Sequence, residues 1–211
     1  MIVSHKFQMI FIKTQKTAGS SIERWLADHL GERDIKVGSG DGTDKLNTSP
    51  ADAHWGESHL PWTYVRDHWT REWEQYFTWC VERNPWDKMV SWWWWHQSRN
   101  LERVRDKSFK QWVMGPQPSQ LDDWCRYADT LTNEVQVDRV VRFEDLPSAL
   151  STLNLPYSGE LEEYRIHTNS RPEGHYSLYY DAESKEWIEQ IYERVIQRFN
   201  YSFHVPESKV E

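Results

Sequence analysis

A run of small and hydroxylated residues around one lysine, Lys16-Thr17-Ala18-Gly19-Ser20-Ser21, has a composition that suits anion binding. The apolar run Phe7 to Ile12 before it predicts a buried strand, and the amphipathic stretch up to Leu30 predicts a helix. Backbone N–H groups between the carboxyl end of a strand and the amino end of a helix bind phosphate-like groups. We expect Ala18 and Gly19 to let a ligand approach the backbone, while the lysine and the hydroxyls contact it.

Arg83 and Ser91 form a second group with suitable chemistry. Asn84 is a good helix N-cap and Pro85 fits a first helical turn, so a helix should begin there and return Ser91 to the face that carries its start. Arginine offers a forked, permanently charged partner to a phosphate, and serine adds a hydrogen bond. An isolated Arg-Asn-Pro group would be explained better by an ordinary capped helix whose arginine forms a surface ion pair.

The lysine loop is not a Walker A loop, because Gln15 stands where that loop needs a glycine. It resembles the 5'-phosphosulfate-binding loop of sulfotransferases that use 3'-phosphoadenosine 5'-phosphosulfate (PAPS). The segment Glu82 to Ser91 is similar, position by position, to the 3'-phosphate-binding segment of the same family. Weaker similarity covers Arg142 to Leu146 and the region after Asn169. The sequence departs from the family at Gln15, where a proline is common, and shows no clear adenine-stacking motif.

This resemblance implies in-line transfer of a sulfuryl group from PAPS, as co-substrate, to an acceptor hydroxyl or amine. Lys16 would stabilise the leaving phosphate, and the amides from Thr17 to Ser21 would hold the 5'-phosphate. Arg83 and Ser91 would hold the 3'-phosphate, and Arg171 with Gly174 would close over the nucleotide. The resemblance implies no metal, and the histidines show no compact ligand spacing.

A general base must take the acceptor's proton, and a histidine near neutral pH suits this task. His59, in Ser-His-Leu-Pro, resembles the catalytic histidine of cytosolic sulfotransferases. His54, in the same loop, resembles a histidine of carbohydrate sulfotransferases and is the rival. A surface loop histidine without a role is the alternative for either.

Composition limits the other functions. A chain of 211 residues has room for one compact domain, residues 1–211. A net charge of -8 and a pI of about 5.6 argue against a nucleic-acid partner. Cys80 and Cys125 are too few for a disulfide framework, and no apolar stretch is long enough for a membrane span. We expect a cytoplasmic protein whose acceptor is a glycan or a small hydroxyl compound.

Strand-like and helical segments alternate along the chain. Residues 76–81 and 137–143 predict strands, residues 84–99, 121–131 and 183–199 predict helices, and residues 62–74 predict a short helix. Residues 36–61 have no sustained period and predict a long loop. This alternation predicts an α/β protein, and the resemblance implies a three-layer P-loop-like fold with a mainly parallel sheet flanked by helices.

Two other functions remain open on the sequence. One is a P-loop-like nucleotide kinase or NTPase, for which Glu144 and Asp145 could serve as the magnesium-binding acids although the loop fails. The other is a non-catalytic nucleotide- or carbohydrate-binding module that uses the tryptophans. The tetrad Trp92 to Trp95 cannot all stack on a sugar, because four consecutive helical residues face all directions.

Overall fold

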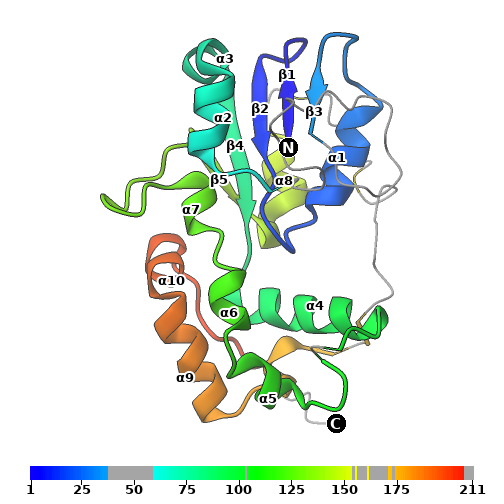
Figure 1. Ribbon diagram of the computed structural model, residues 1–211, viewed down its shortest axis with the longest axis vertical. Coiled ribbons are helices and arrows are strands. Elements are labelled where there is room, and N and C mark those ends of the chain that lie inside the picture. Colours follow the sequence, from blue (N-terminus) through cyan, green and yellow to red (C-terminus); the bar gives the residue numbers. More distant parts are fainter. Residues whose placement is uncertain are drawn as a thin grey trace. The chain divides into compact units, whose positions relative to one another are not determined.

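The structure is a computed structural model, and it forms two compact units (Figure 1). Unit 1 comprises Met1–Glu82 and Asp123–Ile166, and unit 2 comprises Arg83–Asp122 and His167–Glu211. The residues it describes are 1–37, 59–102, 104–153, 155, 161, 171–172 and 174–206. The predicted loop over residues 36–61, with His54, falls largely outside them.

Unit 1 is built on a mixed five-stranded sheet with the strand order β3-β1-β2-β4-β5. Its strands are β1 (Ile2–Ser4), β2 (Met9–Ile12), β3 (Ile35–Lys36), β4 (Phe77–Glu82) and β5 (Arg139–Arg142). β2 and β4 run parallel, as do β4 and β5, whereas β1 pairs antiparallel with both β2 and β3. The prediction of a mainly parallel sheet is therefore wrong, while the α/β class is confirmed.

The antiparallel pairing of β1 with β2 arises from a tight turn, and the predicted strand included the last two residues of this turn, Phe7 and Gln8. Residues 5–8 reverse the chain between β1 and β2, and Gln8 adopts a left-handed conformation with φ 50°. Adjacent antiparallel strands need only such a short turn, whereas parallel neighbours need a long crossover. The predicted strand from Phe7 accordingly begins at Met9.

The helix predicted after the lysine loop is confirmed as α1 (Gly19–Ala27), which ends before Leu30. Its buried Ile22, Trp25 and Leu26 pack in one apolar cluster with side chains of β2 and β4 such as Phe11 and Trp79. The other helical segments of unit 1 are α2 (Trp62–His68), α3 (Thr70–Gln75), α7 (Trp124–Tyr127), η2 (Phe143–Asp145) and α8 (Leu146–Leu150). The core thus fastens α1 directly behind the loop.

The helix predicted over residues 121–131 is wrong, because only Trp124–Tyr127 is helical. Ala128 turns to an extended conformation and bridges Val135 across a short antiparallel turn. Asp129 stabilises that turn, since its side chain accepts hydrogen bonds from two backbone amides in it. Local side-chain bonds of this kind compete with helical hydrogen bonds.

Unit 2 is helical in its described residues. Its segments are α4 (Pro85–Ser98), α5 (Phe109–Val113), α6 (Gln117–Gln120), η5 (Tyr176–Tyr179), α9 (Ala182–Ile191) and α10 (Glu193–Phe199). The prediction for α4 is confirmed, including its cap, because the Asn84 side chain accepts from the amides of Trp86 and Asp87. The helix predicted over 183–199 breaks at Tyr192, whose hydroxyl donates to the carbonyl of Pro118 at 2.7 Å.

The tryptophan tetrad divides between core and surface. Trp92 and Trp93 are buried against Trp112, with ring centroids 5.3 and 5.4 Å away. Trp94 and Trp95 are half-buried, and the Trp94 indole donates to the Tyr179 hydroxyl. The prediction that the four cannot form one stacking surface is confirmed.

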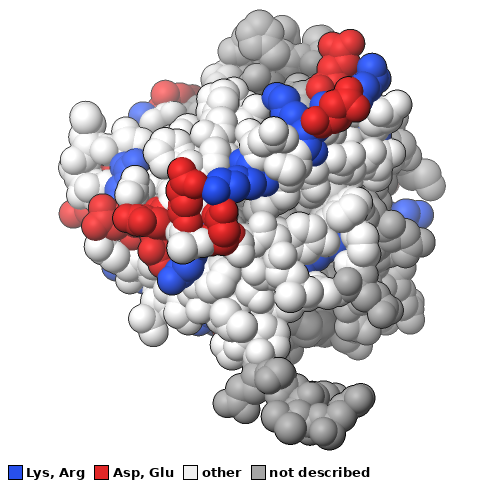
Figure 2. Space-filling model, turned by 90° about the horizontal axis from the view of Figure 1, so that it is seen from below, with Lys and Arg blue, Asp and Glu red and all other residues white. Residues whose placement is uncertain are grey.

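Figure 2 shows acidic and basic side chains interspersed on the face it draws.

Candidate functional site

The lysine loop connects β2 to α1 in a backbone conformation that is unusual for its residues. Lys16 and Ala18 have φ values of 60° and 62°, in the left-handed region that non-glycine residues rarely adopt. Ala18 is the N-cap residue of α1, and its side chain forms no capping hydrogen bond to the first turn. Conformations that cost about 1–3 kcal/mol each cluster at functional sites. The loop therefore presents an uncapped helix start, with its partial positive charge, at the carboxyl end of a parallel strand.

Gly19 is required by the packing of the loop itself. A Cβ atom at this position would lie 2.7 Å from Cγ of Lys13. The Lys13 side chain is held there because its Nζ forms a buried ion pair with Glu23 at 2.5 Å. This packing reason for a glycine stands beside the sequence prediction that Gly19 lets a ligand approach the backbone.

Two threonines fasten the loop to the neighbouring strand. The hydroxyl of Thr14 donates to the carbonyl oxygen of Val81 in β4, and it also lies 2.8 Å from the hydroxyl of Thr17. Both side chains are buried. The Thr17 hydroxyl, which we expected to contact a ligand, is therefore used inside the loop.

Asp123 holds the loop from the other side, and the sequence did not reveal it. Its fully buried carboxylate accepts a hydrogen bond from the backbone amide of Gln15 at 2.8 Å and another from Nε of Arg126 at 2.6 Å. Arg126 also donates to the backbone carbonyl of His59. This chain of bonds ties the lysine loop to the histidine predicted as general base.

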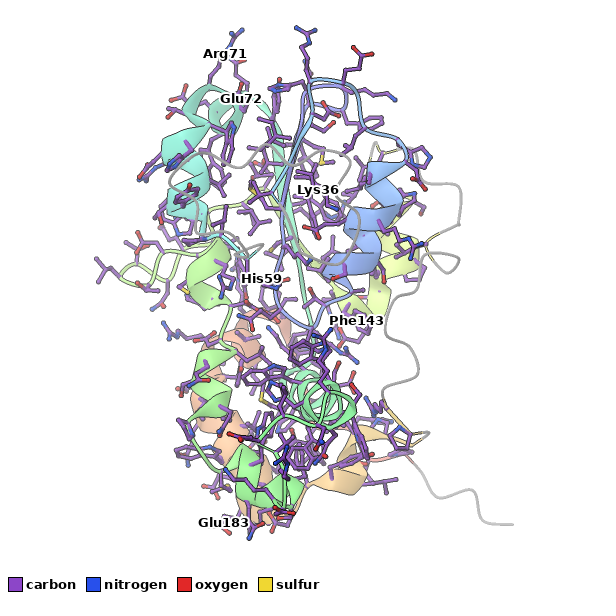
Figure 3. The ribbon with its side chains drawn as sticks, turned by 45° about the vertical axis from the view of Figure 1, so that its right-hand side comes forward. Lys36, His59, Arg71, Glu72, Phe143 and Glu183 are labelled. Atoms are coloured by element: carbon purple, nitrogen blue, oxygen red, sulfur yellow. The ribbon has the colours of Figure 1, made fainter. Side chains whose placement is uncertain are left out.

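His59 lies against the lysine loop, as its predicted role requires (Figure 3). Its Nδ1 is 3.0 Å from the carbonyl oxygen of Lys13, so Nδ1 carries the proton and Nε2 keeps a lone pair. Burial lowers the pKa of His59 to about 4, with the nearby charge of Lys13 adding to this effect and that of Asp123 opposing it. The imidazole is therefore neutral at physiological pH and able to accept a proton. His54 lies outside the described residues.

A buried carboxylate stands at the end of β4 and was assigned no role from the sequence. Glu82 is 1 % exposed and accepts a hydrogen bond from the Tyr127 hydroxyl at 2.8 Å. Burial and the negative charge of Glu82 raise the pKa of Tyr127 well above its ordinary value. The tyrosine thus stays protonated and stabilises the charge of Glu82.

In unit 2, Asp87 brings together Arg83, predicted to hold the 3'-phosphate, and Arg171, predicted to close over the nucleotide. Arg83 donates to one carboxylate oxygen of Asp87 from Nε at 2.8 Å and from Nη2 at 2.6 Å. Arg171 donates to the other oxygen and also to the carbonyl of Gly174. Burial alone would raise the pKa of Asp87, but the charges of the two guanidinium groups lower it below its ordinary value.

Ser91 follows Asp87 by one helical turn of α4, so both side chains lie on the same face of that helix. The structure thus joins Arg83 and Arg171 through Asp87, and Ser91 is one turn further along α4. Asp87, which joins the two arginines, had no predicted function of its own.

Comparison with protein-family models finds no match, and comparison with curated proteins finds none either. Within the described part of the chain, no group of three or more histidine, cysteine or acidic residues is arranged to hold a metal ion. The same residues include no helix long and apolar enough to cross a membrane. Any functional conclusion consequently rests on the residues themselves.

Proposed function

We propose that the chain is a sulfotransferase that moves a sulfuryl group from PAPS to an acceptor hydroxyl or amine and releases adenosine 3',5'-bisphosphate. The observation that carries this proposal is the pair of arginines, Arg83 and Arg171, that share the carboxylate of Asp87, one helical turn before Ser91 in α4. Arg83 and Ser91 were predicted to hold the 3'-phosphate, and Arg171 was predicted to close over the nucleotide. The proposed fold is three-layered and P-loop-like around the parallel strands β2, β4 and β5.

The chemistry of this cluster suits a 3'-phosphate. Two guanidinium groups supply forked donors with permanent charge, and a serine hydroxyl supplies a directional hydrogen bond. Asp87 neutralises one of the two positive charges, which leaves a net attraction for a dianion and keeps both forks oriented. A donor without the 3'-phosphate would lose these contacts.

The lysine loop of unit 1 suits the other end of the donor. The amides from Thr17 through Ala18, Gly19 and Ser20 to Ser21 would bind the 5'-phosphosulfate at the uncapped start of α1. Lys16 would stabilise the charge that grows on the 5'-phosphate as its bond to sulfur breaks. The strained loop supports this assignment, because preorganised donors need no rearrangement during the reaction.

His59 is the proposed general base. As the acceptor oxygen attacks the sulfur atom, the lone pair on Nε2 would take the acceptor's proton. Its fixed tautomer supports this role, whereas burial, which lowers its pKa to about 4, makes it a weaker base than an exposed histidine. His54 stays the rival, and the acceptor is proposed to be a glycan or a small hydroxyl compound.

Calorimetry with adenosine 3',5'-bisphosphate, AMP and ATP tests the proposal. We expect the bisphosphate to bind most tightly, and Arg83→Gln to weaken its binding by about 2 kcal/mol, roughly 30-fold. Ser91→Ala should weaken it less, and the exposed Arg105→Gln of the same unit is the matched control. Equal binding of ATP and the bisphosphate would favour a kinase or NTPase instead. Tight bisphosphate binding without sulfuryl transfer to any acceptor tried would favour a binding module.

A further inference from the structure

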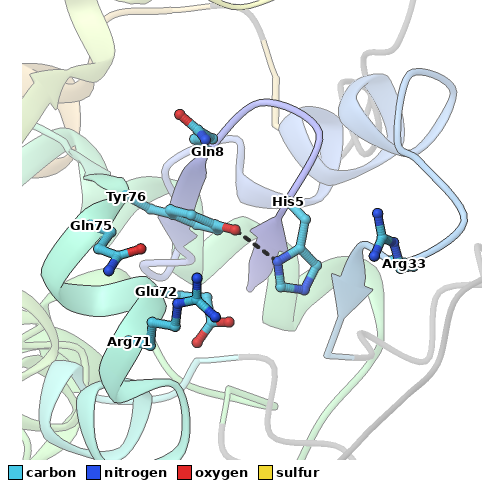
Figure 4. Close-up of a pocket in the computed structure, with 7 residues that line it drawn as sticks. All are labelled: His5, Gln8, Arg33, Arg71, Glu72, Gln75 and Tyr76. Carbon is cyan, nitrogen blue, oxygen red and sulfur yellow. Dashed lines mark hydrogen bonds between the residues drawn. The ribbon is translucent and has the colours of Figure 1, made fainter.

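Unit 1 contains a polar pocket at the ends of β2 and β4 opposite to the lysine loop (Figure 4). The loop follows the carboxyl end of β2, whereas Gln8 and Tyr76 of the pocket directly precede β2 and β4. The cavity has a volume of about 390 Å³, within the range of small-molecule sites. Nothing in the proposed transfer reaction uses it.

The charged groups of this pocket favour an anion. Arg33, from the connection between α1 and β3, and Arg71, from α3, both line it, together with the single acid Glu72. Among the residues that the structure describes, neither guanidinium forms a hydrogen bond or an ion pair. Two unneutralised cations against one carboxylate make a locally positive site in a chain of net charge -8.

Its walls are held in place by hydrogen bonds among three segments. The buried carboxylate of Asp34 accepts from the Ser4 hydroxyl, from the amides of His5 and Lys6, and from the amide of Gly31. These bonds join the turn between β1 and β2 to the segment that carries Arg33. The same hydrogen bonds occupy both carboxylate oxygens of Asp34, so this carboxylate does not pair with Arg33 or Arg71.

The third wall, α3, is joined to the same turn. Nδ1 of His5 lies 2.9 Å from the Tyr76 hydroxyl, and the amide of Phe77 donates to the carbonyl of Gln8 at 2.9 Å. Figure 4 shows the His5–Tyr76 bond along one side of the pocket. The arginines therefore project from a frame that is built before any ligand arrives, which lowers the cost of binding.

The size and remaining lining indicate what accompanies the anionic group. A bare oxyanion fills only a small part of the cavity, and no aliphatic side chain lines it. The amides of Gln8 and Gln75, with the polar groups of His5 and Tyr76, offer donors and acceptors for hydroxyl groups. We propose that this pocket binds a sugar-sized polyol carrying one phosphate or sulfate group, with Arg33 and Arg71 holding the anionic group.

The test uses the whole protein and glucose 6-phosphate, glucose 6-sulfate, glucose and inorganic phosphate as probes. Binding is followed through the NMR signals of the His5 ring and of the amides of Arg33 and Arg71, which report on this pocket alone. We expect saturable binding of one or both sugar esters, at least about 10-fold tighter than that of inorganic phosphate, and none of glucose. Equal affinity for the ester and for inorganic phosphate would overturn the sugar part of the proposal.

Two variants decide whether the arginines carry the binding. Arg33→Gln/Arg71→Gln should weaken it by about 10-fold or more, whereas Arg24→Gln/Arg139→Gln, a matched pair of exposed arginines in unit 1, should not. Lys16→Ala distinguishes this pocket from the proposed donor site. Whether or not the transfer proposal is correct, the His5 signals of this variant should respond to the sugar esters as those of the wild type do. Saturable binding that survives in the first double variant, or signals that never saturate, would overturn the site.

Discussion

The carboxylate shared by Arg83 and Arg171 predicts a large and measurable coupling in unit 2. Asp87→Asn keeps the shape of the side chain but removes the charge that both guanidinium groups face. The three side chains are mostly buried, with exposed fractions of 17 % for Asp87, 12 % for Arg83 and 22 % for Arg171. Exposed ion pairs contribute about 0–1 kcal/mol and loss of one partner from a buried pair costs about 3–5 kcal/mol. We expect the free energy of unfolding to fall by about 2–3 kcal/mol, between these limits.

A double-mutant cycle isolates this interaction. Urea unfolding of the wild type, Asp87→Asn, Arg171→Gln and the double variant gives the free energy of coupling between the two side chains. We expect about 1–2 kcal/mol, because the asparagine can still accept one hydrogen bond. Strictly additive single effects would refute the reasoning, since they would mean that the pair does not interact in solution.

The pH dependence of the same variant gives an independent check. The arginines hold the pKa of folded Asp87 below that of the unfolded chain. Its contribution is therefore complete above about pH 4 and is lost as the pH falls through the folded-state pKa. The stability difference between the wild type and Asp87→Asn should be constant near neutral pH and shrink in acid. A difference that grows in acid would contradict the assignment.

Four further changes have expected outcomes. Gly19→Ala should lower the free energy of unfolding by about 2 kcal/mol, because the new Cβ meets the ion-paired Lys13 side chain; unchanged urea midpoints would contradict this. As the pH falls from about 6.5 to about 4, only the unfolded imidazole of His59 gains a proton, so the wild type should lose up to roughly 3 kcal/mol of unfolding free energy. His59→Gln should remove this loss, and parallel pH–stability curves of the two proteins would contradict the lowered pKa. Lys16→Ala should leave folding intact and remove nearly all sulfuryl transfer from PAPS; turnover at the wild-type rate would exclude its role. Arg83→Ala should weaken donor binding by about 2 kcal/mol or more, and unchanged donor affinity would make Arg83 purely structural.

Local patterns predicted the elements that depend mainly on local physics. The strand before the lysine loop, the helix after it and the capped helix α4 follow from an apolar run, an amphipathic period and an Asn-Pro start. The general-base role of His59 was derived from resemblance to a known segment rather than from spacing, and it stays a prediction. Elements of this kind can be predicted from the sequence because their conformation depends little on residues far away along the chain.

The errors arise where distant residues decide. Residues 121–131 have a helical composition, but Asp123 is used by the amide of Gln15, more than a hundred positions away in sequence, and the helix stops after Tyr127. No periodicity contains that information, because the partner is fixed only when the sheet has formed. The same holds for the sheet direction, since the polar residues after Ser4 interrupt the apolar pattern but do not show with which strand the first apolar run pairs.

Both parts of the proposed donor site owe their geometry to the side chains of Lys13, Glu23 and Asp87, which have no predicted contact with the donor. Gly19 is small so that Lys13 can reach Glu23, and Asp87 binds two arginines so that neither extends freely into water. A phosphate that met unrestrained side chains would have to order them first, and that ordering costs about 0.5–1.5 kcal/mol for each long side chain. The supporting residues therefore contribute to affinity through preorganisation. Substituting them should weaken binding even though every predicted contact residue is still present.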